Sequence, residues 1–285
     1  MMRDSVKRQY TREWIQYDRP QTMYDKSIQK YITELLSSGD NFAKDPAKLM
    51  EDFKKDMHTW ITSSKLNEVS GLDDFKDRDI IIGVTGYLDD LHLMKNCVVL
   101  KNEYKYHWRL FGDSKFRKLD ELVQGDNLIL SMPFPFYGDV HPDMNKIIEV
   151  CNEKQVNVHI DSAWYGCCKD IKFSYSEPCI KSAAFSLSKG LGLPGNRIGI
   201  RYCKERWNGP VSIMNDFNMN NESLVWLGVK FISKFGSDYW WNKYGDVYEK
   251  VCKDFDLKPT KAIHLALDND KPVGVRPLMR CLKNE

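Results

Sequence analysis

Between residues 79 and 202, short apolar runs alternate with segments that have a helical pattern. Runs of this length are typical of buried strands, and intervening helices favour parallel pairing because a parallel connection needs a long crossover. The sequence therefore predicts an α/β fold, a three-layer sandwich with a mainly parallel central sheet and helices over both faces. The runs are DIIIGV (79–84), NCVVL (96–100), DNLILSM (126–132), VNVHID (156–161), SAAFSL (182–187) and IGIRY (198–202).

The segments on either side of this region have a different character. The amino-terminal segment is polar and helical, with Asp45 and Pro46 placed as the cap and first residue of a helix. The carboxyl-terminal segment is helical and rich in aromatic residues, and it ends in KPVGVRPLMR, a candidate strand. We expect the two ends to form a small, abbreviated α+β domain. The predicted divisions are 1–65, 66–205 and 206–285.

Composition limits the partners of the chain. The net charge of +2 comes from 42 basic and 40 acidic residues that are well mixed, which argues against a nucleic-acid partner. No apolar run is long enough to span a membrane, and the amino terminus lacks the apolar core of a secretory signal. The eight cysteines include no CxxC pair. We therefore expect a cytoplasmic protein with reduced thiols, no metal site and no membrane partner.

Ligands of open α/β sheets bind at the carboxyl ends of the strands, so the residues that follow the apolar runs are candidates. The first run leads into GVTGYLDDL, a turn that opens into a helix and can direct backbone N–H groups at a phosphate. It lacks the third glycine of the dinucleotide motif, so a plain turn and a dinucleotide site are both alternatives. Asp161 ends the fourth run, where its carboxylate either faces the ligand crevice or caps the next turn.

The segment SLSKGLGLPGNRIG places Ser186, Ser188 and Arg197 around Lys189. The planar fork of arginine donates two hydrogen bonds to a phosphate, and serine hydroxyls add neutral donors. A buried lysine beside such an anion site can form a Schiff base with a carbonyl group. From these residues alone, Lys189 is a solvated loop charge, a phosphate clamp or a nucleophile.

Together, HIDSAWYG and SLSKGLGLPGNRIG resemble the fold-type I pyridoxal-phosphate enzymes, specifically the class I/II aminotransferases. The resemblance implies that Lys189 carries pyridoxal 5′-phosphate as a Schiff base. It implies that Ser186 and Arg197 hold the phosphate, with Ser188 as a further cofactor contact. Asp161 matches the carboxylate that keeps the pyridine nitrogen protonated.

Shorter matches extend the resemblance toward both ends. GVTGYL implies that Val84 and Thr85 donate hydrogen bonds to the phosphate, and KNEYKYH implies that Tyr104 stacks on the cofactor ring. His107 falls where some members place a histidine behind the aspartate. VGVRPL resembles the strand whose arginine, here Arg276, binds the substrate's α-carboxylate. The alternatives are a core aromatic for Tyr104 and a surface arginine for Arg276.

Two positions depart from the family pattern. Pro135 stands where the family has an asparagine that hydrogen-bonds the 3′-oxygen of the cofactor, and Trp164 stands where it has a tyrosine that bonds the same atom. Proline offers no side-chain donor and indole only one. Tyr165 or Tyr137 could restore a bond, and we count Tyr165 among the predicted cofactor contacts. Without these bonds the pKa of the Schiff-base nitrogen rises, which leaves chemistry other than transamination open.

The resemblance implies a homodimeric enzyme of amino-acid metabolism or biosynthesis, an aminotransferase that acts on an amino acid or a related amine. One alternative is a lyase, a cyclase or another enzyme for Cα, Cβ or Cγ chemistry with the same cofactor. The other is a catalytically decayed binding module of the same fold. The identity of the substrate does not follow from the residues.

Overall fold

The computed structural model describes residues 10–17, 20–38, 45–193 and 195–283. Within them, the central sheet has seven strands in the order β2, β9, β8, β6, β5, β3, β4. β9 runs antiparallel to both of its neighbours, whereas every pair from β8 to β4 is parallel. The predicted, mainly parallel sheet is therefore confirmed. The strands are β2 (Asp77–Ile81), β3 (Cys97–Leu100), β4 (Phe116–Arg117), β5 (Asn127–Ser131), β6 (Asn157–Asp161), β8 (Ile180–Ser186) and β9 (Gly199–Cys203).

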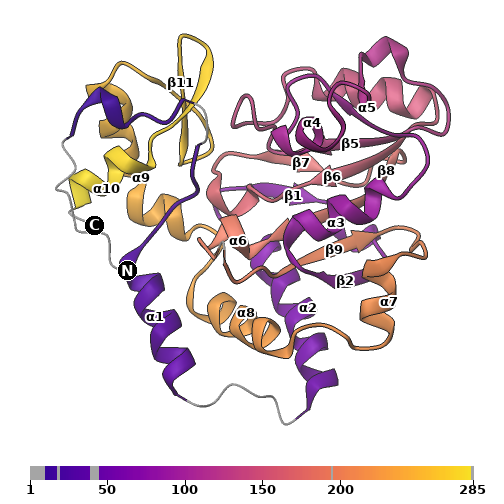
Figure 1. Ribbon diagram of the computed structural model, residues 1–285, viewed down its shortest axis with the longest axis horizontal. Coiled ribbons are helices and arrows are strands. Elements are labelled where there is room, and N and C mark those ends of the chain that lie inside the picture. Colours follow the sequence, from indigo (N-terminus) through magenta and orange to yellow (C-terminus); the bar gives the residue numbers. More distant parts are fainter. Residues whose placement is uncertain (1–9, 18–19, 39–44, 194, 284–285) are drawn as a thin grey trace.

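Each face of the central sheet has its own apolar core, because alternate residues of a strand point to opposite faces. In β5, Leu128 and Leu130 belong to the larger core, whereas Ile129 belongs to the smaller one. Helices thus cover both faces, as the three-layer prediction requires (Figure 1). The larger core takes in α2 (Pro46–Thr62), α5 (Met144–Glu153) and α8 (Glu222–Lys234), and the smaller one α3 (Gly83–His92) and α7 (Pro210–Asp216).

The two amphipathic helices that precede the sheet are α1 (Lys26–Ser37) and α2. The carboxylate of Asp45 accepts a hydrogen bond from the backbone N–H of Lys48 at 3.0 Å, and Pro46 is the first helical residue of α2. α2 packs on α8 and on the β2 edge of the large sheet. Within the flanking segments 1–65 and 206–285, the structure therefore places α2, α7 and α8 with the large domain.

A smaller α+β domain combines the two ends of the described chain, as the sequence predicts. Gln16 forms a β-bridge with Gly274, and Arg12 forms an ion pair with Asp268 at 2.7 Å. Figure 1 shows this indigo segment beside the yellow carboxyl-terminal elements. The domain contains an antiparallel sheet of β10 (Lys258–Pro259), β11 (Leu265–Asp268) and β12 (Lys271–Gly274), with α9 (Tyr239–Asp254) and α10 (Arg276–Lys283).

Shorter elements complete the described chain. β1 (Glu68–Ser70) and β7 (Lys172–Ser174) form a parallel two-stranded sheet, which the sequence does not predict because three residues show too little alternation. No described helix is long and apolar enough to cross a membrane. The remaining elements are η1 (Arg12–Trp14), η2 (Leu72–Asp74), η3 (Leu119–Glu121), η4 (Tyr165–Cys167), α4 (Lys105–Phe111) and α6 (Leu187–Gly190).

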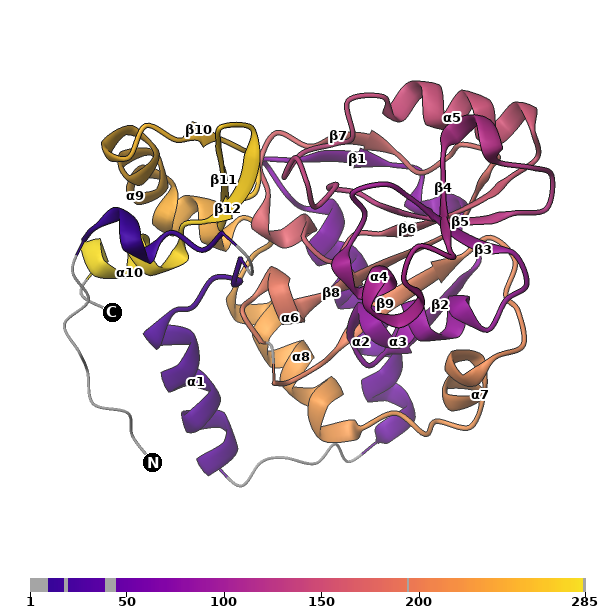
Figure 2. The same cartoon turned by 45° about the horizontal axis from the view of Figure 1, so that its top comes forward.

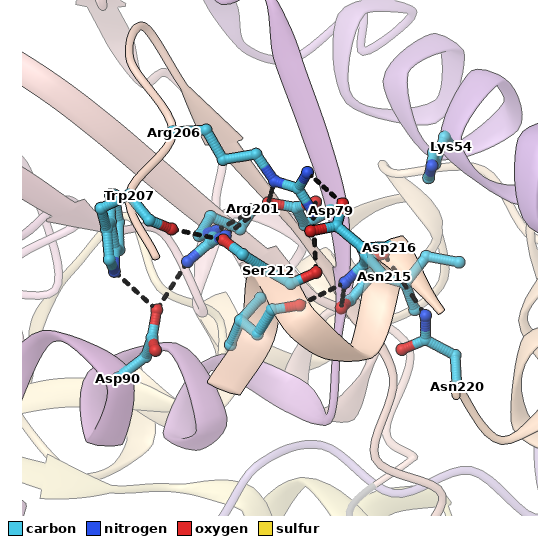
Figure 3. Close-up of polar contacts among 12 residues, drawn as sticks. Lys54, Asp79, Asp90, Arg201, Arg206, Trp207, Ser212, Asn215, Asp216 and Asn220 are labelled. Carbon is cyan, nitrogen blue, oxygen red and sulfur yellow. Dashed lines mark hydrogen bonds and ion pairs between the residues drawn. The ribbon is translucent and has the colours of Figure 1, made fainter. Parts of the chain in front are cut away.

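A buried ionic network holds α3 and α7 on the β2 edge of the sheet (Figure 3). Arg201 of β9 has no exposed side-chain surface and donates to Asp79 of β2 and, at 2.6 Å, to Asp90 of α3. It also donates to the hydroxyl of Ser212 in α7, at 2.9 Å. The indole of Trp207 also donates to Asp90, at 2.8 Å. Through Asp90 the network holds the last turn of α3, and the first turn of the same helix leads into the candidate site.

Candidate functional site

The carboxyl ends of the central strands meet around one narrow cavity. Ser131 ends β5, Asp161 ends β6, and α6 begins directly after β8. Figure 2 shows α6 at the junction between the large sheet and the smaller domain. The cavity measures about 10 Å³ and is lined by Tyr104, Ser131, Pro133, Pro135, Asp161, Ala163, Trp164 and Lys189. Three of the predicted site residues, from distant parts of the sequence, therefore lie together.

Lys189 projects from α6 between two aromatic rings. Its Nζ lies 4.9 Å from the ring centre of Tyr104 and 5.1 Å from that of Trp164. α6 is positioned by Ser186, whose side chain accepts a hydrogen bond from the backbone N–H of Ser188 at 3.0 Å. Gly190 approaches the neighbouring loop so closely that a Cβ on Gly166 would lie 2.8 Å from the Cα of Gly190.

Asp161 is buried beside Lys189. Its carboxylate accepts a hydrogen bond from the backbone N–H of Ala163 at 2.8 Å. Burial raises the pKa of Asp161, and the positive charge of Lys189 opposes that rise. Burial likewise lowers the pKa of Lys189, against the influence of Asp161. Burial thus shifts both groups toward their neutral forms, and the neutral form of a lysine is the one that can accept a proton.

Glu103 is a second buried carboxyl group at this site, and the sequence reasoning missed it. Its oxygens accept hydrogen bonds from the backbone N–H of Tyr104, at 2.6 Å, and from the backbone N–H and hydroxyl of Ser131, at 2.5 and 2.7 Å. Burial raises its pKa to about 7, against the influence of these hydrogen bonds. Its position directly before Tyr104, the predicted stacking residue, could have pointed to Glu103 as a site residue. The local sequence does not reveal that Glu103 contacts Ser131.

The start of α3 and the segment after α6 together form a cradle for an anion. Gly83 has a φ of +62°, and a Cβ there would lie 2.9 Å from a guanidinium nitrogen of Arg197. Arg197 donates to the hydroxyl of Thr85 at 2.6 Å. The hydroxyl of Ser188 is buried and has no hydrogen-bond partner among the described residues. The first N–H groups of a helix have no partner within it, and together with a guanidinium and an unsatisfied hydroxyl they suit a phosphate.

Val84 is the second residue of α3, with its side chain in the smaller core, so any hydrogen bond it offers comes from the backbone.

Tyr165 does not face the cavity, contrary to its prediction as a cofactor contact. It is fully buried, and its hydroxyl donates to the backbone carbonyl of Ile61 at 2.8 Å. The structure therefore directs Tyr165 away from Lys189. One residue along the chain, Trp164 takes the place beside the lysine instead.

Two further predicted contacts lie outside the cavity lining. Arg276 is the first residue of α10 and not part of a strand, because β12 ends at Gly274. Its guanidinium donates to the backbone carbonyl of Thr22 at 2.9 Å and to the side chain of Gln21. His107 faces His92 of α3, with 3.0 Å between the two ring nitrogens, so its hydrogen bond is not to the aspartate.

Several solved structures share this arrangement of elements. An aromatic aminotransferase from Pyrococcus horikoshii OT3 matches with a TM-score of 0.59 and 14% identity, over 90% of this chain and 80% of that chain. This chain has the aminotransferase fold. YbdL from Escherichia coli, described as having a methionine aminotransferase function, matches with a TM-score of 0.58 and 12% identity, over 88% of this chain and 77% of that chain. A PLP-bound C-S lyase from Staphylococcus hominis matches with a TM-score of 0.58 and 11% identity, over 88% of this chain and 75% of that chain.

The shared fold confirms the architecture that the resemblance implies. At such low identity the comparison concerns the fold, and the roles of individual residues rest on the geometry above. No protein-family model matches the sequence, and no curated protein matches it.

Proposed function

We propose that this chain is a pyridoxal 5′-phosphate-dependent enzyme that acts on an amino acid or a related amine, as an aminotransferase. The observation that carries the proposal is the pairing of Lys189 with buried Asp161, at the carboxyl ends of the strands and between two aromatic rings. A phosphate cradle at the adjacent helix start supports it, because the cofactor needs both an amine partner and an anion site.

The residues fit this cofactor in their chemistry. Ser186, Ser188, Thr85 and Arg197 would hold the phosphate, together with the backbone of α3, and the unpartnered hydroxyl of Ser188 is the specific sign of a missing ligand. Asp161 would hold the pyridine nitrogen, and Tyr104 would cover the ring. Because the cavity of about 10 Å³ admits about one water molecule, its side chains must move apart to take in a ring.

Lys189 is the proton carrier in this proposal. Pyridoxal phosphate, when bound, supplies an electron sink for the carbon that bears the substrate's amine. Lys189 Nζ would remove the proton from that Cα as a general base, and burial favours this role by lowering the pKa of the amine. Asp161 would keep a proton on the ring nitrogen, and Trp164 would limit the access of water. Arg276 would bind the α-carboxylate after releasing its contacts with Gln21 and Thr22.

Elimination chemistry is the second candidate, and one observation favours it. Pro135 and Trp164, which replace two hydrogen-bond donors of the family, both line the cavity next to Lys189. Hydrogen bonds to the cofactor's 3′-oxygen would therefore differ from those in ordinary aminotransferases. A solved structure of similar fold is a C-S lyase. Transfer of an amine to a keto acid would favour the first candidate, and release of a cleaved side chain would favour the second.

The proposal is tested by loading the purified protein with pyridoxal phosphate and recording its visible absorbance and amine transfer. We expect wild-type protein to acquire a visible band that Lys189→Ala does not acquire, with amine transfer reduced at least a thousandfold, since both rest on one amine. Lys181→Ala, in the strand that precedes α6, is the matched control and should behave as wild type. A band retained with full turnover in Lys189→Ala would refute the assignment. A wild-type protein that takes up no cofactor would point to a decayed binding module.

We also propose that the chain acts as a homodimer, as the resemblance implies. Large apolar side chains stay exposed on and just after α7, the helix that packs on the β2 edge of the central sheet. They are Ile213, Phe217 and Met219, which are 52%, 72% and 64% exposed. A group of this kind is typical of a surface that a partner covers.

A further inference from the structure

His264 is a buried histidine with no hydrogen-bond partner. It is 1% exposed, and both of its ring nitrogens lack a partner among the described residues. An unsatisfied buried polar group destabilises the folded state, so such a group calls for an explanation. Apolar residues of similar shape would fill the same space without that cost. The imidazole therefore indicates a function that packing does not account for.

The surroundings of His264 connect it with the candidate site. Its ring meets that of Trp164 edge to face, with 4.6 Å between the ring centres, and Trp164 in turn lies beside Lys189. The charges that act on the imidazole are those of Lys189 and Arg276, both positive. His264 thus lies near the lysine beside which the substrate's amine would lie and the arginine that would bind its carboxylate.

The loop that carries His264 is held firmly in place. The backbone N–H of Ile263 donates to the carbonyl of Cys167 at 3.0 Å, and Ala262 forms a β-bridge with Cys168. The carbonyl of His264 accepts from the N–H of Val275, the residue before Arg276, at 3.1 Å. The imidazole is therefore fixed relative to both the large-domain loop after Trp164 and the start of α10, where a ligand between the two domains would lie.

We propose that His264 is a binding residue for the carboxylate of the substrate, which it contacts together with Arg276. This inference rests on the proposed function, since it takes the substrate's amine to lie at Lys189. An anion placed beside Arg276 and His264 would satisfy an imidazole nitrogen and pair with the positive charge of the guanidinium. A turn of the half-buried Trp164 ring, of the kind that ligands commonly induce, would open the path. The substrate class is then an amino acid with a free carboxylate, and not a simple amine.

The matched variants are His264→Phe and His264→Asn. Phenylalanine keeps the ring contact with Trp164 and removes both nitrogens, whereas asparagine keeps a hydrogen-bond donor. If the imidazole serves binding at the expense of stability, His264→Phe will have an equal or higher Tm than wild type. A role in packing or hydrogen bonding within the fold predicts a lower Tm for this variant.

The probe is propanoate, with propanamide as its uncharged counterpart, titrated calorimetrically into protein loaded with pyridoxal phosphate. We expect wild type to bind propanoate more tightly than propanamide, and His264→Phe to lose affinity for propanoate about tenfold or more, as for a hydrogen bond to a charged group. His264→Asn should keep part of that affinity. Uptake of cofactor, read from the visible absorbance, should be equal in all three proteins.

The outcomes separate this inference from the proposed function. If wild type takes up the cofactor but His264→Phe binds propanoate as wild type does, the proposed function stands and the role of His264 is refuted. The same holds if wild type does not distinguish propanoate from propanamide. If wild type takes up no cofactor, both proposals fail together. If His264→Phe folds poorly, that result contradicts the inference. The inference would then stand only if a well-folded His264→Gln variant loses affinity for propanoate.

Discussion

Glu103 shows how one side chain links the candidate site to the pH dependence of folding. Its oxygens accept three hydrogen bonds, which favour the ionised form, while burial and the nearby charge of Asp161 favour the neutral form. Burial dominates, so the pKa rises from 4.5 to about 7. Between these values the folded protein holds a proton that the unfolded chain has released.

We predict that Glu103→Gln flattens the pH dependence of stability. Because the folded-state pKa is raised, the contribution of Glu103 is fully present below about pH 4.5 and is lost as pH rises to about 7. The free energy of unfolding of wild type relative to Glu103→Gln should fall by about 3 kcal/mol across this window. Urea unfolding at several pH values measures it, with exposed Glu121→Gln as the control. A difference that does not change with pH would contradict the prediction.

The site residues also differ in how far the sequence could place them. Lys189, Asp161 and Arg197 could be nominated because they stand at motif positions and at the ends of apolar runs. Tyr165 could not be oriented, because the direction of a side chain after a strand depends on the turn that follows. The structure turns its hydroxyl to Ile61, in a helix distant in sequence. His264 carries no local signal, since its burial comes from contacts between two domains.

At the scale of elements, the antiparallel strand β9 connects several others because it carries Arg201. This arginine links β2, α3 and α7 through two carboxylates and a hydroxyl, all of them buried. A buried ion pair adds little net stability, but removing one partner leaves the other charge without compensation. The attachment of α3, and with it the phosphate cradle, therefore depends on this side chain.

We predict that Arg201→Met lowers the free energy of unfolding by about 3–5 kcal/mol, because Asp90 stays buried without its cation and Asp79 keeps only its ion pair with Arg206. The surface pair of Lys48 and Asp52 offers a control of the opposite kind, with side chains 69% and 45% exposed. Lys48→Met should cost about 0.5 kcal/mol or less. Urea unfolding of the two variants checks the comparison, and equal effects would disprove a buried role for Arg201.

The prediction of elements was most accurate where the pattern is longest. The apolar runs and the two amino-terminal helices correspond to strands and helices of the structure, because hydrophobic periodicity over a full element reports its buried face. Short elements such as β1 and β7 were not predicted. The sequence predicts a strand around Arg276, but the strand β12 ends before Val275 and the helix α10 begins after it. A strand and a helix of such short length cannot be separated by periodicity.

At the scale of the whole molecule, we predict a homodimer that depends on the exposed side chains Phe217 and Met219. Sedimentation equilibrium at micromolar concentration should give twice the chain mass of 33.3 kDa. Replacing both residues by serine should shift the equilibrium to monomer, because the apolar area that drives association is lost. Leu93→Ser, which changes an equally exposed apolar residue at the end of α3, is the control. A monomeric wild type would contradict this prediction.

The sequence by itself determined the class of fold and nominated the segments that form the candidate site. Apolar runs with helices between them restrict the chain to a mainly parallel sheet, and ligands of such sheets bind at the strand ends where Asp161 and Lys189 stand. Only the tertiary structure decided which side chains meet there. Arg197 reaches Thr85, Glu103 reaches Ser131, and His264 reaches Trp164 across long stretches of chain. Local patterns report the buried face of an element, whereas these contacts depend on how elements pack, which no single segment encodes.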